Sequence, residues 1–232
     1  MEPHDAFKGS PWGAEPIADW NDPAYWANQY RELLAEADPW ERDQTIYGDV
    51  SLLVWMLTEA GELPLSSPRT LLDAGCGIAL IPHLLTFWGF QVTAIDLCPQ
   101  AIEIGSHHQP TEEELCTYPI YYQIPRPPPG QPPGGPVAYR VGDWLTADLP
   151  SFGVICCRNS LRCATKANWR RSLLRFHDLL VPGGLLILET HNALELQEEV
   201  EVLLAECGFA PWVGEARRDS SAKYWIALWP TG

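Results

Sequence analysis

Positive charge is scarce in this sequence. Its 232 residues include 15 Lys or Arg but 30 Asp or Glu, which gives a formal net charge of −15. A nucleic-acid partner is not expected, because its phosphates bind clusters of basic side chains. Long apolar runs are also missing: no stretch approaches the roughly 20 residues that cross a bilayer, and the N-terminal residues contain no signal-like apolar segment. We therefore expect a cytoplasmic protein that binds neither nucleic acid nor a membrane.

Paired cysteine motifs are absent as well. The seven cysteines include no C-x-x-C pair, and their odd number and irregular spacing do not suggest a disulfide framework. Cys156 and Cys157 are adjacent, so on a strand their side chains would point to opposite faces and would not bind one metal ion. We expect reduced thiols and no metal. Hydrophobic residues make up 46% of the chain, which is enough for a sizeable core.

Residues 70–97 carry the pattern around which the rest of the chain is arranged. In order they contain a strand ending near Asp73, the glycine turn Gly75-Cys76-Gly77, an apolar helix near 78–88, and a strand ending at Asp96. That order is the first unit of a doubly wound nucleotide-binding sheet. The glycines let the backbone approach a ligand closely, and the second acid lies where it can accept both ribose hydroxyls.

Two details argue against a dinucleotide ligand. Leu80 replaces the third glycine of G-x-G-x-x-G, and Asp73 would repel a pyrophosphate but suits a positively charged amino group. The segments LLDAGCG and VTAIDL resemble the first motif and the second strand of the class I S-adenosylmethionine-dependent methyltransferases. The resemblance implies S-adenosylmethionine as cofactor. The cofactor-binding residues that it implies on this first unit are Asp73, Gly75, Cys76, Gly77, Asp96 and Leu97.

Later segments extend the resemblance to residue 232. A strand near 137–141 precedes Asp143 and Trp144, and in the family an acid here accepts the adenine amino hydrogens while its neighbour flanks the ring. For Trp144 the alternative is simple packing. The segment LLVPGGLLIL resembles another family signature, and residues 210–215 and 224–229 fit a final antiparallel strand pair. The implied fold is α/β, a doubly wound and mostly parallel seven-stranded sheet with an antiparallel C-terminal strand and a helical N-terminal cap.

The composition divides the chain into two regions. Residues 1–68 are expected to form a flexible leader and a helical cap, and residues 69–232 the methyltransferase core, interrupted by a Pro-rich insertion at 106–136. The segment YWANQY resembles the entry of several protein-lysine and small-molecule methyltransferases. Its residues Trp26 and Tyr30 share a helix face, so they either cover the cofactor or belong to an aromatic core stripe.

The acceptor side is less specific. CRNSL, at 157–161, resembles the Cys-Arg-Asn of chemotaxis glutamate methyltransferases and the Asp-Arg-x-x-Leu of thiopurine-type enzymes. Arg158 and Asn159 follow the fourth strand, where an acceptor is expected; Arg158 would hold an anionic acceptor or form a surface ion pair. His191, after the fifth strand, would act as a general base or merely cap a helix. Gly153 stands where the family often has an acid.

We therefore expect an enzyme that transfers a methyl group from S-adenosylmethionine to a small-molecule acceptor. Two alternatives stay open at this point. One is methylation of a protein side chain such as lysine, which the YWANQY segment favours. The other is a catalytically silent S-adenosylmethionine-binding partner of another enzyme, favoured by Gly153 and by the lack of an obvious base.

Overall fold

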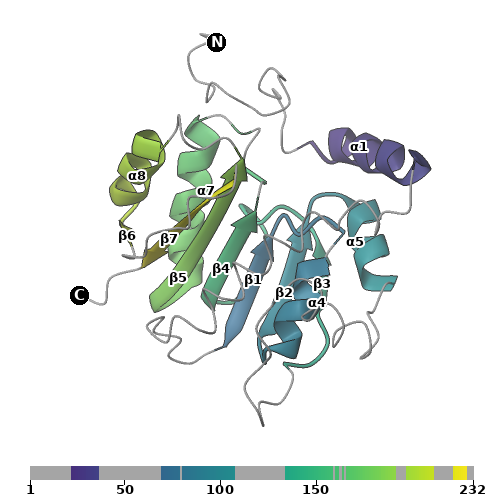
Figure 1. Ribbon diagram of the computed structural model, residues 1–232, viewed down its shortest axis with the longest axis horizontal. Helices are drawn as coiled ribbons and strands as arrows, with labels where there is room; N and C mark the ends of the chain where they lie inside the picture. The colour runs from purple at the N-terminus through teal and green to yellow at the C-terminus, as the bar shows by residue number, and fades with distance from the viewer. Residues whose placement is uncertain are drawn as a thin grey trace.

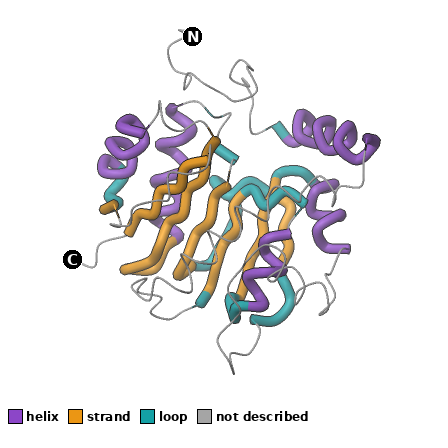
Figure 2. The backbone as a smooth tube through the Cα atoms, viewed as in Figure 1, coloured by secondary structure: helices purple, strands orange, loops and turns teal. Residues whose placement is uncertain are grey.

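The computed structural model describes residues 22–36, 69–78, 80–107, 134–158, 160–161, 164, 166–191, 197–211 and 222–228. Helices and strands alternate along most of this part of the chain (Figures 1 and 2). The helices are α1 (Pro23–Glu36), α4 (Leu80–Phe87), α5 (Pro99–His107), α7 (Lys166–Leu179) and α8 (Gln197–Glu206). The strands are β1 (Thr70–Ala74), β2 (Gln91–Asp96), β3 (Ala138–Val141), β4 (Phe152–Arg158), β5 (Leu180–His191), β6 (Ala210–Pro211) and β7 (Ala222–Leu228).

These strands form one sheet in the order β3-β2-β1-β4-β5-β7-β6. All pairs from β3 to β5 are parallel, whereas β7 pairs antiparallel with β5 and with β6. The predicted α/β fold with a mostly parallel sheet is confirmed. The strand order reverses direction between β1 and β4, and in doubly wound sheets ligands bind at the carboxyl ends of the strands at such a switch point.

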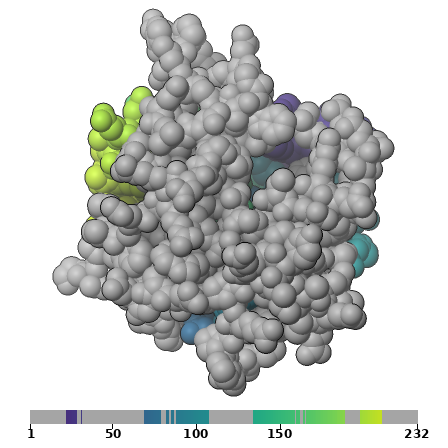
Figure 3. All heavy atoms as spheres, viewed as in Figure 1, coloured from purple at the N-terminus to yellow at the C-terminus, as the bar shows by residue number. Residues whose placement is uncertain are grey.

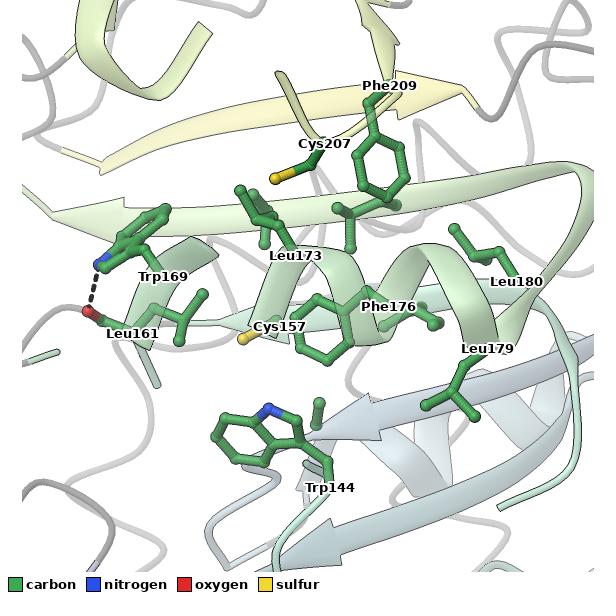
Figure 4. Close-up of a cluster of buried hydrophobic side chains, with 14 of the residues drawn as sticks. Trp144, Cys157, Leu161, Trp169, Leu173, Phe176, Leu179, Leu180, Cys207 and Phe209 are labelled. Atoms are coloured by element: carbon green, nitrogen blue, oxygen red, sulfur yellow. Dashed lines mark hydrogen bonds between the residues drawn. The ribbon is translucent and has the colours of Figure 1, made fainter. Parts of the chain in front are cut away.

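The main core lies between the sheet and the two helices α7 and α8. Trp169, Leu173 and Phe176 recur at helical spacing on α7 and are buried against strand residues. The indole Nε1 of Trp169 also donates a hydrogen bond to the Leu161 carbonyl oxygen, at 2.8 Å. Figure 4 shows these side chains directed toward the sheet. The outer side of α8 is exposed, and its atoms are visible at the surface in Figure 3.

The opposite face of the sheet is covered by α4 and α5, which contact β2 and β3. Leu72 and Ala74 belong to the α7 side of the core. Because strand side chains alternate between faces, Leu71 and Asp73 point to the α4 side. This alternation decides where the first acid of the glycine motif is buried.

Proline and glycine in the P-G-G segment of LLVPGGLLIL predict a turn before a strand, but the segment lies within β5. Phe152 of β4 pairs with Leu180 and Val154 pairs with Leu185, so β5 has extra residues between these two pairs. Gly183 has a φ of 77°, and a Cβ on Gly184 would lie 2.8 Å from the Val181 carbonyl oxygen. The two glycines therefore let the strand take up an irregular segment and continue.

The N-terminal helix begins at a residue pattern typical of helix starts, Asp22 followed by Pro23. Asp22 precedes α1, and its Oδ1 accepts a hydrogen bond from the Ala24 N–H at 2.8 Å, as an N-cap residue does. Pro23 occupies the first helical position. The helix contacts α5, and Figure 1 shows it near the ends of the strand arrows. The apolar spacing of residues 47–60 predicts a second helix, and that segment lies outside the described residues.

The Pro-rich insertion is described only at its two ends. Its 108–133 part lies outside the described residues. At the far end, the N–H of Gly134 donates to the Thr86 carbonyl oxygen at 2.8 Å. A Cβ at this position would lie 1.8 Å from the Phe90 carbonyl oxygen, so only glycine fits. The insertion is thus joined to the turn between α4 and β2, at the amino end of the sheet.

Candidate active site

The glycine turn after β1 has the backbone geometry that its sequence requires. Gly75 and Gly77 have φ values of 75° and 57°, in the left-handed region that glycine adopts without strain. The N–H groups of Gly75 and Cys76 both donate to the carbonyl oxygen of Ile95, at 2.8 and 3.1 Å. The turn therefore folds back onto the carboxyl end of β2, at the edge of the sheet where ligands bind.

Asp96 holds this turn in place. Its side chain is buried, with Oδ2 accepting a hydrogen bond from the Gly77 N–H at 2.9 Å and Oδ1 from the Cys98 N–H at 2.8 Å. Burial raises the pKa of Asp96, and hydrogen bonds from the N–H groups of Cys98, Gly77 and Leu97 oppose that rise. Each carboxylate oxygen can accept a further hydrogen bond. The predicted ribose acceptor thus has a structural role that the sequence did not reveal.

Asp73 is the second buried acid. It lies one residue before the end of β1, between Ala94 of β2 and Cys156 of β4 in the strand register, and is 3% exposed. Its pKa is raised to about 7, chiefly by burial; the Arg158 guanidinium lowers it and the Asp96 carboxylate raises it. When ionised, two buried carboxylates near one guanidinium carry a surplus negative charge. A positively charged ligand group, such as an ammonium, would balance that charge.

Cys76 lies between the two glycines and is half-buried. Burial, and then the nearby negative charges of Asp73 and Asp96, raise the pKa of its thiol well above the usual value. A protonated thiol is a poor nucleophile, so Cys76 contributes shape and backbone to the site. Leu97, which follows Asp96, is also half-buried.

Asp143 follows β3 next to the same site. The N–H of the preceding Gly142 donates to the Asp96 carbonyl oxygen at 2.8 Å, which joins the ends of β2 and β3. Asp143 Oδ1 accepts a hydrogen bond from the Leu145 N–H at 2.8 Å. This contact fixes the side chain and leaves Oδ2 for another donor.

Trp144 points away from the ligand edge and into the core. It is 2% exposed, and its ring centroid lies 6.2 Å from that of Phe176. Its indole Nε1 donates to Ser172 Oγ at 3.4 Å, and Figure 4 shows the ring directed toward α7. These contacts pack the ring against α7, and its role beside an adenine stays a prediction.

The acceptor-side residues are only partly described. Arg158 ends β4, is half-buried, and lies near enough to Asp73 to lower its pKa. Asn159 lies outside the described residues. His191 ends β5, with its backbone paired to Ala222 of β7, but its side chain is outside the described part. Ser160 turns inward: its Oγ lies 3.0 Å from the Gly75 and Arg158 carbonyl oxygens and 3.2 Å from that of Ala74.

A tyrosine and a histidine near the buried acids were missed by the sequence analysis. The Tyr139 hydroxyl of β3 lies 2.5 Å from Nε2 of His83 on α4, and the same Nε2 lies 3.2 Å from the Gly105 carbonyl oxygen. Burial raises the pKa of Tyr139, and the neighbouring acidic groups of Cys76 and Asp73 add to the rise. Tyr139 is therefore close to the acidic side of the site.

The two cap residues differ in how far they are described. The Trp26 side chain is half-buried and meets Tyr25 edge to face, with ring centroids 5.2 Å apart. Tyr30 lies on α1, one helical turn later, but its side chain is outside the described part. Within the described residues, no group of three or more His, Cys, Asp or Glu side chains is arranged to hold a metal ion.

Comparison with known proteins extends over most of the chain. The family described as "Methyltransferase domain" matches residues 53–226. A curated relative, the mitochondrial ubiquinone biosynthesis O-methyltransferase of Schizosaccharomyces pombe, is 26% identical over 141 residues. That match covers 60% of this chain and 44% of the relative, so the chain matches less than half the length of that protein.

Two solved structures have a similar fold. Magnesium protoporphyrin IX methyltransferase from Synechocystis PCC 6803, with bound S-adenosylmethionine, has a TM-score of 0.60 at 15% identity, over 93% of this chain and 99% of that one. The N-methyltransferase NodS from Bradyrhizobium japonicum WM9, with bound S-adenosylhomocysteine, has a TM-score of 0.58 at 15% identity, over 89% and 98%. With the family match, the glycine turn and the switch-point topology, the chain belongs to the methyltransferase domain family and has the class I, Rossmann-like methyltransferase fold.

Proposed function

We propose that this protein transfers the methyl group of S-adenosylmethionine to a small-molecule acceptor. The observation that carries the proposal is the pair of buried acids, Asp73 and Asp96, beside the glycine turn at the switch point. S-adenosylmethionine is positively charged at its sulfonium sulfur and at its ammonium group. A site with surplus negative charge stabilises such a ligand and repels a pyrophosphate.

We propose the following contacts with the cofactor. Asp73 receives the ammonium group, and the backbone of the Gly75–Gly77 turn lies against the ligand. Asp96 accepts the ribose hydroxyls with its remaining lone pairs, and Leu97 packs beside the ribose. Asp143 accepts the adenine amino group through Oδ2, since Oδ1 is occupied by the Leu145 N–H. Trp26 and Tyr30 cover the cofactor from α1.

The reaction needs little beyond correct placement of two molecules. A lone pair of the acceptor attacks the methyl carbon while the carbon–sulfur bond breaks, and the bonding electrons stay on sulfur to give neutral S-adenosylhomocysteine. Holding the reactants in line supplies much of the acceleration. Arg158 and Asn159 bind the acceptor at the end of β4, and His191 accepts a proton where the acceptor must lose one.

A small-molecule acceptor is favoured over a protein side chain. The curated relative is an O-methyltransferase of ubiquinone biosynthesis, and the Synechocystis structure is a magnesium protoporphyrin IX methyltransferase. The net charge of −15 disfavours a nucleic acid. None of the helices in the described part of the chain is long and apolar enough to span a membrane. We also propose that the protein is cytoplasmic and that it can bind a further protein partner.

The silent-partner alternative loses part of its support. Gly153 is the second residue of β4 and Arg158 its last. Five residues of extended strand span about 16 Å, so Gly153 lies near the amino end of the strand, away from the ligand edge. The missing acid therefore has no direct bearing on the chemistry at the carboxyl end.

For the whole chain we propose a leader and helical cap over residues 1–68 and a core over 69–232 that contains the insertion at 106–136. The antiparallel pairing of β7 with β5 supports a complete seven-stranded methyltransferase sheet. The contact of α1 with α5, which starts just after Asp96, supports a cap over the cofactor.

The cofactor assignment has a direct test. Calorimetric titration is expected to show that S-adenosylmethionine and S-adenosylhomocysteine bind, and that NAD does not. A matching assay follows the label of methyl-labelled S-adenosylmethionine into extracted small molecules and into protein. Tight NAD binding without any response to the sulfur cofactors would refute the proposal. Cofactor binding with label in neither fraction would instead support a silent partner.

The cap assignment predicts a loss of affinity for Trp26→Ala. An aromatic face attracts a sulfonium by roughly 0.5–2 kcal/mol, and a closed cap also excludes water. We expect the variant to bind S-adenosylmethionine about tenfold more weakly, with a smaller loss for the neutral S-adenosylhomocysteine. If the melting temperature falls while both affinities stay at the wild-type level, Trp26 is a packing residue and is not part of the cofactor site.

A further inference from the structure

The hydroxyl of Ser160 lies between the ends of β1 and β4. Its Oγ is within 3.0 Å of two carbonyl oxygens, one from Gly75 in the glycine turn and one from Arg158 at the end of β4. The Ala74 carbonyl oxygen is 3.2 Å away. One hydroxyl proton serves one carbonyl at a time, so Ser160 links the turn to the β4 loop through closely competing hydrogen bonds.

Ser160 also fills the space behind the turn. A Cβ placed on Gly75 would lie 2.0 Å from Ser160 Oγ and 2.6 Å from its Cβ. The next nearest atom is Cζ3 of Trp144, at 3.4 Å. The glycine turn therefore rests on two side chains, one polar and one aromatic, and only the serine also hydrogen-bonds to it.

A buried thiol lies beside the same hydroxyl. Burial raises the pKa of Cys157, the Asp73 charge adds to the rise, and a hydrogen bond from the Ser160 side chain lowers it. A bond that lowers the pKa of a thiol is one in which the hydroxyl donates to the sulfur. The single Ser160 hydroxyl proton is therefore shared between this sulfur and the backbone carbonyl oxygens around it.

We propose that Ser160 is a positioning residue that sets the distance between the cofactor turn and the acceptor loop. This rests on the proposed function, in which the turn holds S-adenosylmethionine while Arg158 and Asn159 hold the acceptor. In-line transfer is sensitive to that distance, because a displacement of about 1 Å can reduce the rate about a hundredfold. Ser160 is covalently part of one loop and hydrogen-bonded to the other.

The test compares Ser160→Ala with Ser172→Ala. Ser172 is a matched control: it is a buried serine in the same core, bonded to the Trp144 indole, with no hydrogen bond to the turn. In ligand-free protein, amide hydrogen exchange at Gly75 and Cys76 is expected to be roughly fivefold faster in Ser160→Ala than in the wild type. A change of this size corresponds to the loss of one hydrogen bond. S-adenosylhomocysteine is expected to bind Ser160→Ala about three- to tenfold more weakly. Ser172→Ala should lower the melting temperature without either change.

If the two variants have equal exchange rates at Gly75 and Cys76 and equal affinities for S-adenosylhomocysteine, the proposal is overturned and Ser160 is a packing residue. Ser160→Cys, which keeps an atom at the γ position, replaces the alanine variant if that one fails to fold. A wild-type protein that binds no sulfur cofactor would refute the proposed function, and the exchange comparison, made without ligand, would still decide the role of Ser160.

Discussion

Asp73→Asn is expected to make the protein more stable and its cofactor site weaker. The pKa of Asp73 is about 7 in the folded protein against an ordinary value of 3.8. Between these values the folded state holds a proton that the unfolded state has lost, so the stability of the wild type falls as the pH rises from about 4 to 7. At about 1.4 kcal/mol for each pKa unit, the total loss is on the order of 4 kcal/mol. Asparagine cannot ionise, and the variant should lack this loss.

The stability difference is measured by urea unfolding of both proteins at pH 5 and pH 8. Between these two pH values, the free energy of unfolding of the variant is expected to rise by several kcal/mol relative to that of the wild type. The exposed acid Asp148 supplies a control, since Asp148→Asn should leave the free energy of unfolding unchanged at both pH values. A variant that tracks the wild type at both pH values would mean that Asp73 is not the buried group that titrates.

The same variant is expected to bind S-adenosylmethionine roughly 10- to 150-fold more weakly at pH 8, because it loses a hydrogen bond between charged groups worth about 1.5–3 kcal/mol. In the proposed site, Asp73 of the wild type must be ionised to bind the ammonium group. Its affinity should therefore fall by up to tenfold for each pH unit below about 7. Calorimetry in buffers of different ionisation enthalpy should detect a proton released on binding near neutral pH, and the variant should release none from this group.

Asp96→Ala is expected to damage both the turn and the ribose site. The substitution leaves the Gly77 and Cys98 N–H groups without their present acceptor. An unsatisfied buried donor costs about 1–3 kcal/mol, although relief of the buried charge offsets part of that loss. Affinity for S-adenosylhomocysteine should fall by roughly 10- to 150-fold, from the lost hydrogen bonds to a charged group.

Asp96→Asn separates the two roles of this residue. An amide oxygen can still accept from one of the two N–H groups, while the amide nitrogen cannot accept from the other. We expect the asparagine variant to lie between wild type and alanine in both melting temperature and affinity for S-adenosylhomocysteine. If both variants bind with unchanged affinity, the ribose is held elsewhere and Asp96 only supports the turn.

Local patterns in the sequence predicted the frame of the site well. The glycine turn and its two acids occupy the predicted strand ends, because spacing within a single β-α-β unit is set by nearby residues. The spacing of Trp169, Leu173 and Phe176 on α7 and the Asp22 cap of α1 are local patterns of the same kind. The assignment to class I methyltransferases, made from these motifs, is confirmed by the family match.

Contacts between distant parts of the chain were not predictable in this way. Trp144 and Ser160 both follow strand ends, and the turns there direct both side chains inward against α7 and Gly75. Tyr139 meets His83 across 56 residues that include the insertion. The direction of a side chain after a strand depends on the neighbouring strands and helices. The periodicity of the sequence contains no information about which strands and helices those are.

The contact of Gly134 with Phe90 bears on how the chain tolerates change. It pins the end of the Pro-rich insertion at the amino edge of the sheet, whereas the glycine turn and both buried acids lie at the carboxyl edge. The Gly134 end of the insertion is thus separated from the glycine turn by the length of a strand. A fluorescent reporter or affinity tag spliced in just before Gly134 is expected to leave the glycine turn in place.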